Sequence, residues 1–188
     1  MSYQFDIKKA EQVVALLLKQ APDQRLNYTA LLKMLYLADR ESIGETGTPI
    51  TGDRPYAMKL GPVLTNIFNL ISQSDWQDED TISHWNSFFE TIDYDLILNT
   101  DPGEDELSDY EIDKLKKIFE QHGKKHYKQL VKETHRLPEW KATFKHGATE
   151  SVLISIHDIL RAVGREEDFD AIQDEMQEDA RLDKLFSE

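Results

Sequence analysis

The stretch TALLKMLYLADRESIGETGTPITGDRPYAMKLGPV, residues 29–63, decides how this chain folds. Apolar residues recur at helical spacing as far as Ile43, which predicts a helix with one buried face. Glycine, proline, threonine and aspartate then dominate residues 44–53 and predict a loop. Residues 56–60 are predicted to be a short extended segment. Pro62 suits the first turn of the next helix, because a backbone N–H is not needed there.

Outside this stretch, the spacing of apolar residues predicts more helices and one β element. Residues 88–98 roughly alternate between apolar or β-branched side chains and polar ones, which predicts a hairpin. Helical spacing predicts further helices over residues 6–20, 108–122, 124–136 and 149–164, and from residue 166 onward. We therefore expect a mainly α fold, a compact single-domain bundle of about seven helices with one small β-hairpin.

Two blocks of sequence, in residues 33–63 and 134–140, carry a family resemblance. Their distinctive residues are Lys33, Tyr36, Asp39, Pro49, Asp53, Tyr56, Gly61, Pro62, Thr134, His135 and Trp140. In this order the two blocks resemble the Panacea domain, the antitoxin domain of SocA-like and GepA-like proteins from bacteria and phages. Glu139 stands between the proline and the tryptophan of the second block and departs from the family pattern there. We expect a Panacea-like domain over residues 1–150 and an acidic helical extension over 151–188, packed on the same domain.

The residues of these blocks have structural uses as well as a possible use in binding a partner. Asp39 lies near the end of the predicted helix, and Asp53 lies in a Gly-Asp turn where its carboxylate can accept backbone amides. His135 ends a predicted helix, where a protonated imidazole interacts well with the last carbonyl groups. Trp140 is large enough to anchor a core or an interface. We favour the structural use for all four.

Composition narrows the class of protein. A chain of 188 residues predicts one domain, and the absence of cysteine excludes disulfides, thiolate metal sites and a cysteine nucleophile. Residues 1–9 do not have the pattern of a signal peptide, and no apolar run is long enough to span a bilayer. These features predict a cytoplasmic protein without a membrane partner. The net charge of −14 makes a nucleic-acid partner unlikely, since such binding depends on basic surface.

Charge is distributed unevenly along the chain. Residues 60–113 contain fourteen Asp and Glu and no Lys or Arg, whereas residues 114–146 contain ten Lys and Arg against three Glu. Either the two regions face each other and neutralise, or they form separate acidic and basic surfaces, each available to a partner. Within the basic region Lys124, Lys128, Lys132 and Arg136 recur every four residues and predict one basic stripe on a helix. The stripe is either a solvated face or a surface for an acidic protein partner or a nucleic-acid backbone.

We find no signature of catalysis, cofactor binding or metal binding in the sequence. His122 and His126 are four residues apart, but Gly123 interrupts the helix between them and no third ligand follows from the spacing. The chain contains neither a Gly-x-Ser-x-Gly elbow nor a glycine-rich phosphate loop. Carboxylate pairs such as Asp39 and Asp53 arise by chance in so acidic a chain. We therefore expect no enzyme activity, no cofactor and no metal.

The resemblance implies an antitoxin that neutralises a cognate toxin by direct contact and is encoded beside it in a bacterial genome or mobile element. It also implies, as a variant, an adaptor that carries the toxin to an ATP-dependent protease. The alternatives are a nucleic-acid-binding regulator of its own operon and an uncharacterised hydrolase that uses Asp39, Asp53 and His135.

Overall fold

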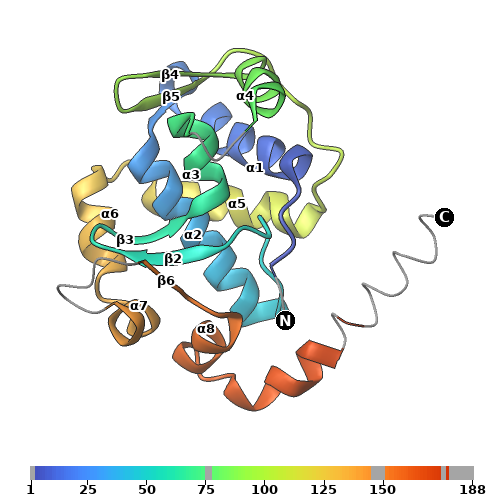
Figure 1. The fold of residues 1–188 in the computed structure, drawn as a ribbon, viewed down its shortest axis with the longest axis vertical. Coiled ribbons are helices and arrows are strands. Elements are labelled where there is room, and N and C mark those ends of the chain that lie inside the picture. Colours follow the sequence, from blue (N-terminus) through green and yellow to red (C-terminus); the bar gives the residue numbers. More distant parts are fainter. Residues whose placement is uncertain (1–2, 75–77, 145–150, 175–176, 178–188) are drawn as a thin grey trace.

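The computed structural model describes residues 3–74, 78–144, 151–174 and 177. Helix α2, Tyr28–Thr46, is the central element, and the other helices and both sheets surround it (Figure 1). The side chain of Asn27 caps its start by accepting from the N–H groups of Thr29 and Ala30. Gly47 ends it in the left-handed conformation, with φ of 87°. Eleven residues of α2 are buried, because helices and a strand cover it on several sides.

Helices α1, Ile7–Gln20, and α5, Asp109–His122, both pack against α2. The remaining α-helices are short: α3, Thr65–Ser72; α4, Glu79–Asn86; α6, Tyr127–Thr134; α7, Pro138–Thr143; and α8, Ile156–Ala162. Two 3-10 turns, η1, Pro22–Gln24, and η2, Glu166–Asp168, complete the bounded helical elements, and residues 169–174 are again helical. None of the helices in these ranges is both long and apolar enough to cross a lipid bilayer.

Two small antiparallel sheets flank the helices. In the first, β5, Asp95–Leu98, lies between β1, Arg25–Asn27, and β4, Phe89–Ile92. In the second, β2, Pro55–Met58, lies between β3, Gly61–Leu64, and β6, Val152–Leu153. The pairing of Tyr56 with Leu153 joins strands almost a hundred residues apart in sequence.

The predicted mainly helical fold is confirmed, but its element count was wrong. The described residues hold two three-stranded sheets instead of one hairpin, although the predicted hairpin is present as β4 and β5. Two helices were missed. Helix α4 buries only Trp85 and so has no apolar stripe to recognise. Helix α7 has six residues, too few to show a periodic pattern, and begins at Pro138.

Pro62 does not begin a helix, as the sequence had suggested. It lies in β3, which within the described part of the chain is an edge strand paired with β2 alone, and a residue without an N–H is tolerated there. The next helix, α3, begins three residues later at Thr65. Helix α6 is also shorter than predicted, so Lys124 precedes it and Arg136 follows it.

The segment after residue 150 packs on the rest of the chain as far as it is described. Strand β6 extends the second sheet, and α8 contacts both α2 and α7. Its apolar residues Ile154, Ile156, Ile159 and Leu160 are buried in the common core. The division of the chain at residue 150 stays a prediction, and most of the predicted last helix lies outside the described residues.

Candidate functional site

The polar motif residues of α2 each bind a different part of the chain. Lys33 is 1% exposed, and its Nζ donates to the carbonyl oxygen of Pro62 at 2.5 Å. This contact attaches β3 to α2. Burial lowers the pKa of the Lys33 ammonium to about 7, because the charged form loses its hydration.

Gly61 allows β3 and α6 to approach this lysine closely. Its φ is +93°, and a Cβ at this position would lie 2.7 Å from Thr134 Oγ1 and 3.1 Å from Lys33 Nζ. Thr134 is fully buried, and its hydroxyl donates to the carbonyl oxygens of Leu130 and Val131 within α6. Gly61 is therefore required both by backbone conformation and by lack of space.

Tyr36 and Arg40 lie one and two helical turns beyond Lys33, and both bind Glu139 at the start of α7. The Tyr36 hydroxyl donates to Glu139 Oε1 at 3.0 Å, and Arg40 Nε donates to the same oxygen at 2.6 Å. The Glu139 side chain is completely buried, and burial together with this carboxylate raises the pKa of Tyr36 well above its usual value. The residue that departed from the family pattern is thus the centre of a buried polar cluster.

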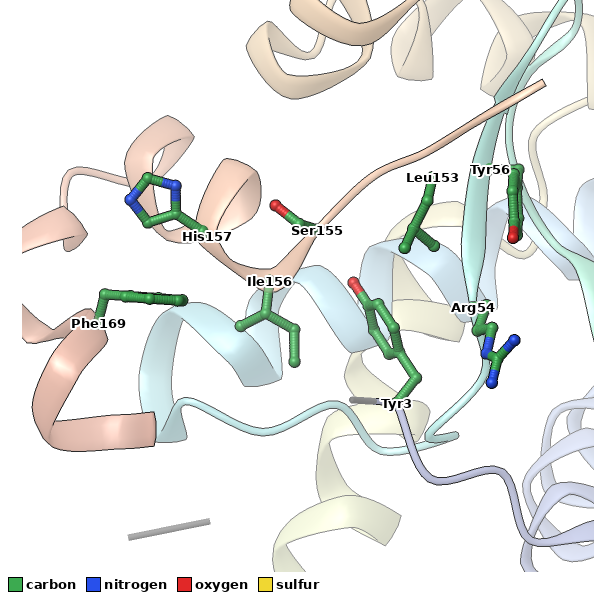
Figure 2. A pocket seen from close by; sticks show the side chains of 8 residues that line it. All are labelled: Tyr3, Arg54, Tyr56, Leu153, Ser155, Ile156, His157 and Phe169. Carbon is green, nitrogen blue, oxygen red and sulfur yellow. The ribbon is translucent and has the colours of Figure 1, made fainter. Parts of the chain in front are cut away.

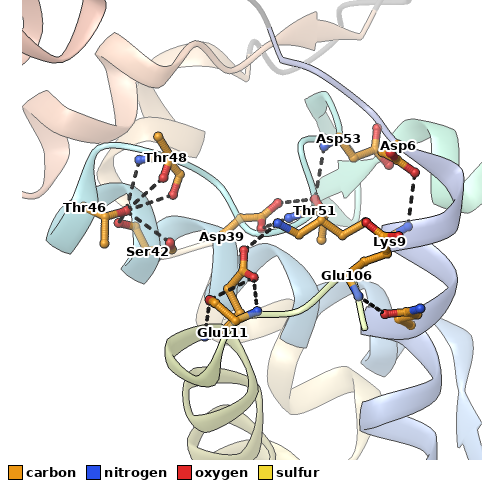
Figure 3. A network of polar contacts seen from close by, with 12 residues as sticks. Asp6, Lys9, Asp39, Ser42, Thr46, Thr48, Thr51, Asp53, Glu106 and Glu111 are labelled. Carbon is orange, nitrogen blue, oxygen red and sulfur yellow. Dashed lines mark hydrogen bonds and ion pairs between the residues drawn. The ribbon is translucent and has the colours of Figure 1, made fainter. Parts of the chain in front are cut away.

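Asp39 and Asp53 organise the loop between α2 and β2 (Figure 3). The Asp39 carboxylate accepts hydrogen bonds from the backbone N–H of Thr51 at 2.8 Å and from the Thr51 hydroxyl. Burial raises the pKa of Asp39 to about 7, although the two bonds from Thr51 act in the opposite direction.

Asp53 caps the start of α3 from a distance in sequence. Its carboxylate accepts from the backbone N–H groups of Asn66 at 3.0 Å and Ile67 at 2.9 Å, and from Arg54 N–H at 2.6 Å. The N-cap residue Leu64 has no side chain that can accept these amides, so Asp53 replaces the usual cap. Burial raises the pKa of Asp53, while these hydrogen bonds favour its ionised form.

The second motif block is held by aromatic stacking. Trp140 is 6% exposed and stacks with His135, whose ring centroid is 4.3 Å away, and with Phe144 at 4.7 Å. Its indole Nε1 donates to the carbonyl oxygen of Met58 at 3.1 Å, which attaches α7 to the second sheet. His135 is the C-cap residue of α6, at the helix end where the sequence had placed it.

Tyr56 lines a pocket of about 300 Å³ between β2, β6, the start of α8 and Phe169 (Figure 2). The side chain of Tyr3 points into the same region, and its hydroxyl donates to the carbonyl oxygen of Ile154 at 2.9 Å. Ser155, also in the lining, donates to Asp158 at 2.6 Å as part of the cap of α8. Pro49 lies in the loop between α2 and β2, next to the buried Ile50.

The four residues of the predicted basic stripe are exposed to solvent. Lys128 and Lys132 are on α6, whereas Lys124 and Arg136 flank it. The Lys128 ammonium lies over the ring of Tyr127, 5.9 Å from its centroid. The structure therefore separates the predicted residues into two sets, motif residues that are buried or half-buried and basic residues that are exposed.

Comparison with known families assigns the chain to one of them. Residues 31–141 match the family model described as the SocA-like antitoxin, Panacea domain. The chain belongs to the SocA-like Panacea domain family. The match to the Panacea domain spans both motif blocks and confirms the predicted resemblance. Neither the curated proteins nor the solved structures gave a match to this Panacea domain chain.

Sequence reasoning missed three residues of the Panacea domain's buried network: Arg40, Thr51 and Glu139. Arg40 follows Asp39 directly, and a charged residue is ordinary in the last turns of a predicted helix. Thr51 sits two residues before Asp53, a spacing typical of a hydroxyl that accepts from a nearby turn amide, as it does from Asp53 N–H at 3.1 Å. Among the described residues, no group of three or more His, Asp or Glu side chains is arranged to hold a metal ion.

Proposed function

We propose that this chain is a cytoplasmic antitoxin that neutralises a toxin protein by direct binding and has no catalytic activity of its own. Membership of the SocA-like Panacea family over residues 31–141 is the observation that carries the proposal. A protein with this role needs a stable scaffold and an exposed surface that fits its partner.

The contacts of the motif support a scaffold more than a reaction centre. The carboxylates of Asp39, Asp53 and Glu139 are buried and accept hydrogen bonds from the chain itself. A catalytic carboxylate has to face a substrate in a cleft, within hydrogen-bond reach of the proton it moves. If the chain were instead a hydrolase that uses Asp39, Asp53 and His135, substituting each would remove activity without lowering the melting temperature. We expect a lower melting temperature for all three.

Co-expression with the protein encoded by the adjacent open reading frame tests the proposal. The tagged chain should recover that protein in a stoichiometric complex and restore growth to cells that express it. An adjacent protein that remains toxic and does not co-purify would contradict the proposal. Repeating the rescue in a strain that lacks its ATP-dependent proteases separates simple blocking from delivery to a protease, since delivery requires the protease and shortens the toxin's half-life.

The exposed residues Lys124, Lys128, Lys132 and Arg136 favour a second candidate, a regulator that binds its own promoter. The net charge of −14 opposes it, because duplex DNA repels an acidic chain on average. A gel shift with the promoter at about 150 mM salt tests whether the chain is such a regulator, since weak electrostatic binding is lost at that salt concentration. A retained, sequence-specific shift would support the regulator.

A further inference from the structure

An apolar groove of about 670 Å³ opens at the start of α2. The first turn of α2 forms one side through Tyr28 and Leu32, and Phe68 of α3 contributes another wall. Two hairpin turns complete the rim, one between β2 and β3 and one between β4 and β5. Segments from both sheets therefore meet at one concave surface, on the side of α2 that carries Lys33.

Each hairpin turn presents a large apolar side chain to solvent at this rim. Leu60, in the turn after β2, is 55% exposed, and Tyr94, in the turn after β4, is 69% exposed. Both turns are anchored to α2. The Tyr94 carbonyl accepts from the backbone N–H of Tyr28 at 2.9 Å, and Lys33 binds Pro62 close behind Leu60. Exposed apolar side chains on anchored turns beside a groove are typical of a preformed protein-binding surface.

The charge of the groove is opposite to that of the molecule. Its lining contains the exposed Lys59 and no Asp or Glu, in a chain with 36 acidic and 22 basic residues. The other lysine of the lining, Lys33, is buried and already donates to Pro62, so Lys59 carries the charge of the rim. The ammonium of Lys128 lies over the ring of Tyr127, which is also part of the lining, so a second exposed lysine lies beside the groove. A basic or uncharged segment gains nothing from these lysines, whereas a carboxylate beside an apolar side chain does.

We propose that this groove binds a segment of the toxin in which an apolar side chain is followed closely by Asp or Glu. The apolar side chain packs against Leu60, Phe68 and Tyr94, and the carboxylate pairs with Lys59 at the rim. The inference rests on the proposed function and adds the binding face and the chemistry of the partner.

Matched substitutions test this assignment with the adjacent-frame protein as the probe. Leu60→Asp and Lys59→Glu should each raise the Kd of the purified complex at least tenfold. Val152→Asp changes an apolar side chain of similar exposure, 44%, on β6, at the opposite edge of the second sheet from β3. Lys132→Glu reverses a charge on α6 outside the groove lining. Both controls should bind within about twofold of the unsubstituted chain, well below the tenfold step that corresponds to about 1.4 kcal/mol.

Wild-type toxin affinity in both Leu60→Asp and Lys59→Glu would overturn the proposal that the groove binds the toxin, but would leave the proposed antitoxin function unaffected. A larger loss in Lys132→Glu assigns binding to the basic residues of α6 and also overturns it. Loss of self-association in Leu60→Asp with unchanged toxin affinity would show that a second copy fills the groove. An unsubstituted chain that fails to bind the toxin removes the proposed function itself, and this inference with it.

A crosslinking experiment gives a positive readout that does not depend on lost binding. A photoreactive phenylalanine in place of Leu60 should crosslink to the toxin, and mass spectrometry should locate the adduct beside an Asp or Glu. Replacing that carboxylate by lysine should then restore binding to the Lys59→Glu variant. An adduct in a segment without a nearby carboxylate, or no restoration, contradicts the proposed chemistry.

Discussion

Glu139 is the residue on which the two motif blocks meet. Its buried carboxylate accepts from Tyr36 at 3.0 Å and from Arg40 at 2.6 Å, so two side chains of α2 depend on one group of α7. Removing one partner of a buried pair leaves the other without compensation for its lost hydration. Polar side chains at such positions therefore hold elements together even though each pair adds little to net stability.

Glu139→Ala should lower the free energy of unfolding by about 3–5 kcal/mol, because Arg40 and Tyr36 lose their common acceptor. Glu133→Ala is the control, since the Glu133 side chain is 37% exposed and is therefore partly solvated where it contacts Lys125 and His122. That change should cost less than about 1 kcal/mol. Urea denaturation of both variants gives the comparison, and equal losses would show that the buried cluster does not stabilise the fold.

Lys33 makes stability depend on pH in the alkaline range. Its pKa is about 7 in the folded chain and 10.5 in the unfolded one, so between these values the unfolded state binds more protons. Stability from this group therefore rises with pH from about 7 towards 10. In Lys33→Met this rise should disappear, whereas Lys132→Met should keep it. Urea denaturation at about pH 7, 8 and 9.5 measures it, and parallel pH profiles for Lys33→Met and the unsubstituted chain would contradict the prediction.

At the scale of elements, three segments meet where β3 passes between α2 and α6. The approach depends on Gly61, since any Cβ there would overlap Thr134 Oγ1 at 2.7 Å. The same strand contains Pro62, whose carbonyl is the acceptor for Lys33. Gly61 and Pro62 thus hold the edge strand β3 in close contact with both α2 and α6.

Gly61→Ala should destabilise the chain by about 1–3 kcal/mol more than Gly164→Ala, since an added methyl group has no room there. Gly164 is a matched control because its φ is +78° and nothing lies within 4 Å of its added Cβ. Both variants carry the same strain of a left-handed alanine, about 1–2 kcal/mol, so their difference measures the lack of space. Equal melting temperatures would show that β3 can move away from α6.

At the scale of the whole molecule, ion pairs show which elements contact the acidic stretch, residues 60–113. Lys8 pairs with Glu106 at 2.5 Å, and Lys19 pairs with Glu104 at 2.5 Å, so the loop before α5 is held against α1. In the basic stretch, residues 114–146, the Lys114 ammonium pairs with Glu45 of α2 at 2.7 Å. These pairs join the acidic stretch to α1 and the basic stretch to α2, and the exposed lysines of α6 remain at the surface.

The two central predictions from sequence, a mainly helical fold and the Panacea family, depended on local patterns. The spacing of Leu31, Leu35 and Ile43 marks α2, and Asn27 and Gly47 delimit it, because helix periodicity and caps are properties of neighbouring residues. The second sheet could not be predicted in this way. Strand β6 has two residues, and it exists only because β2 offers an edge to it.

The sequence by itself determined the central helix, the β4–β5 hairpin and the membership of the family, since each follows from contacts within a short window or from a motif read in order. Only the tertiary structure decided what the motif residues do. Lys33, Tyr36 and Asp39 lie on one helix, but their partners are residues 62, 139 and 51. Such pairings follow from how distant segments pack together, which local spacing does not encode.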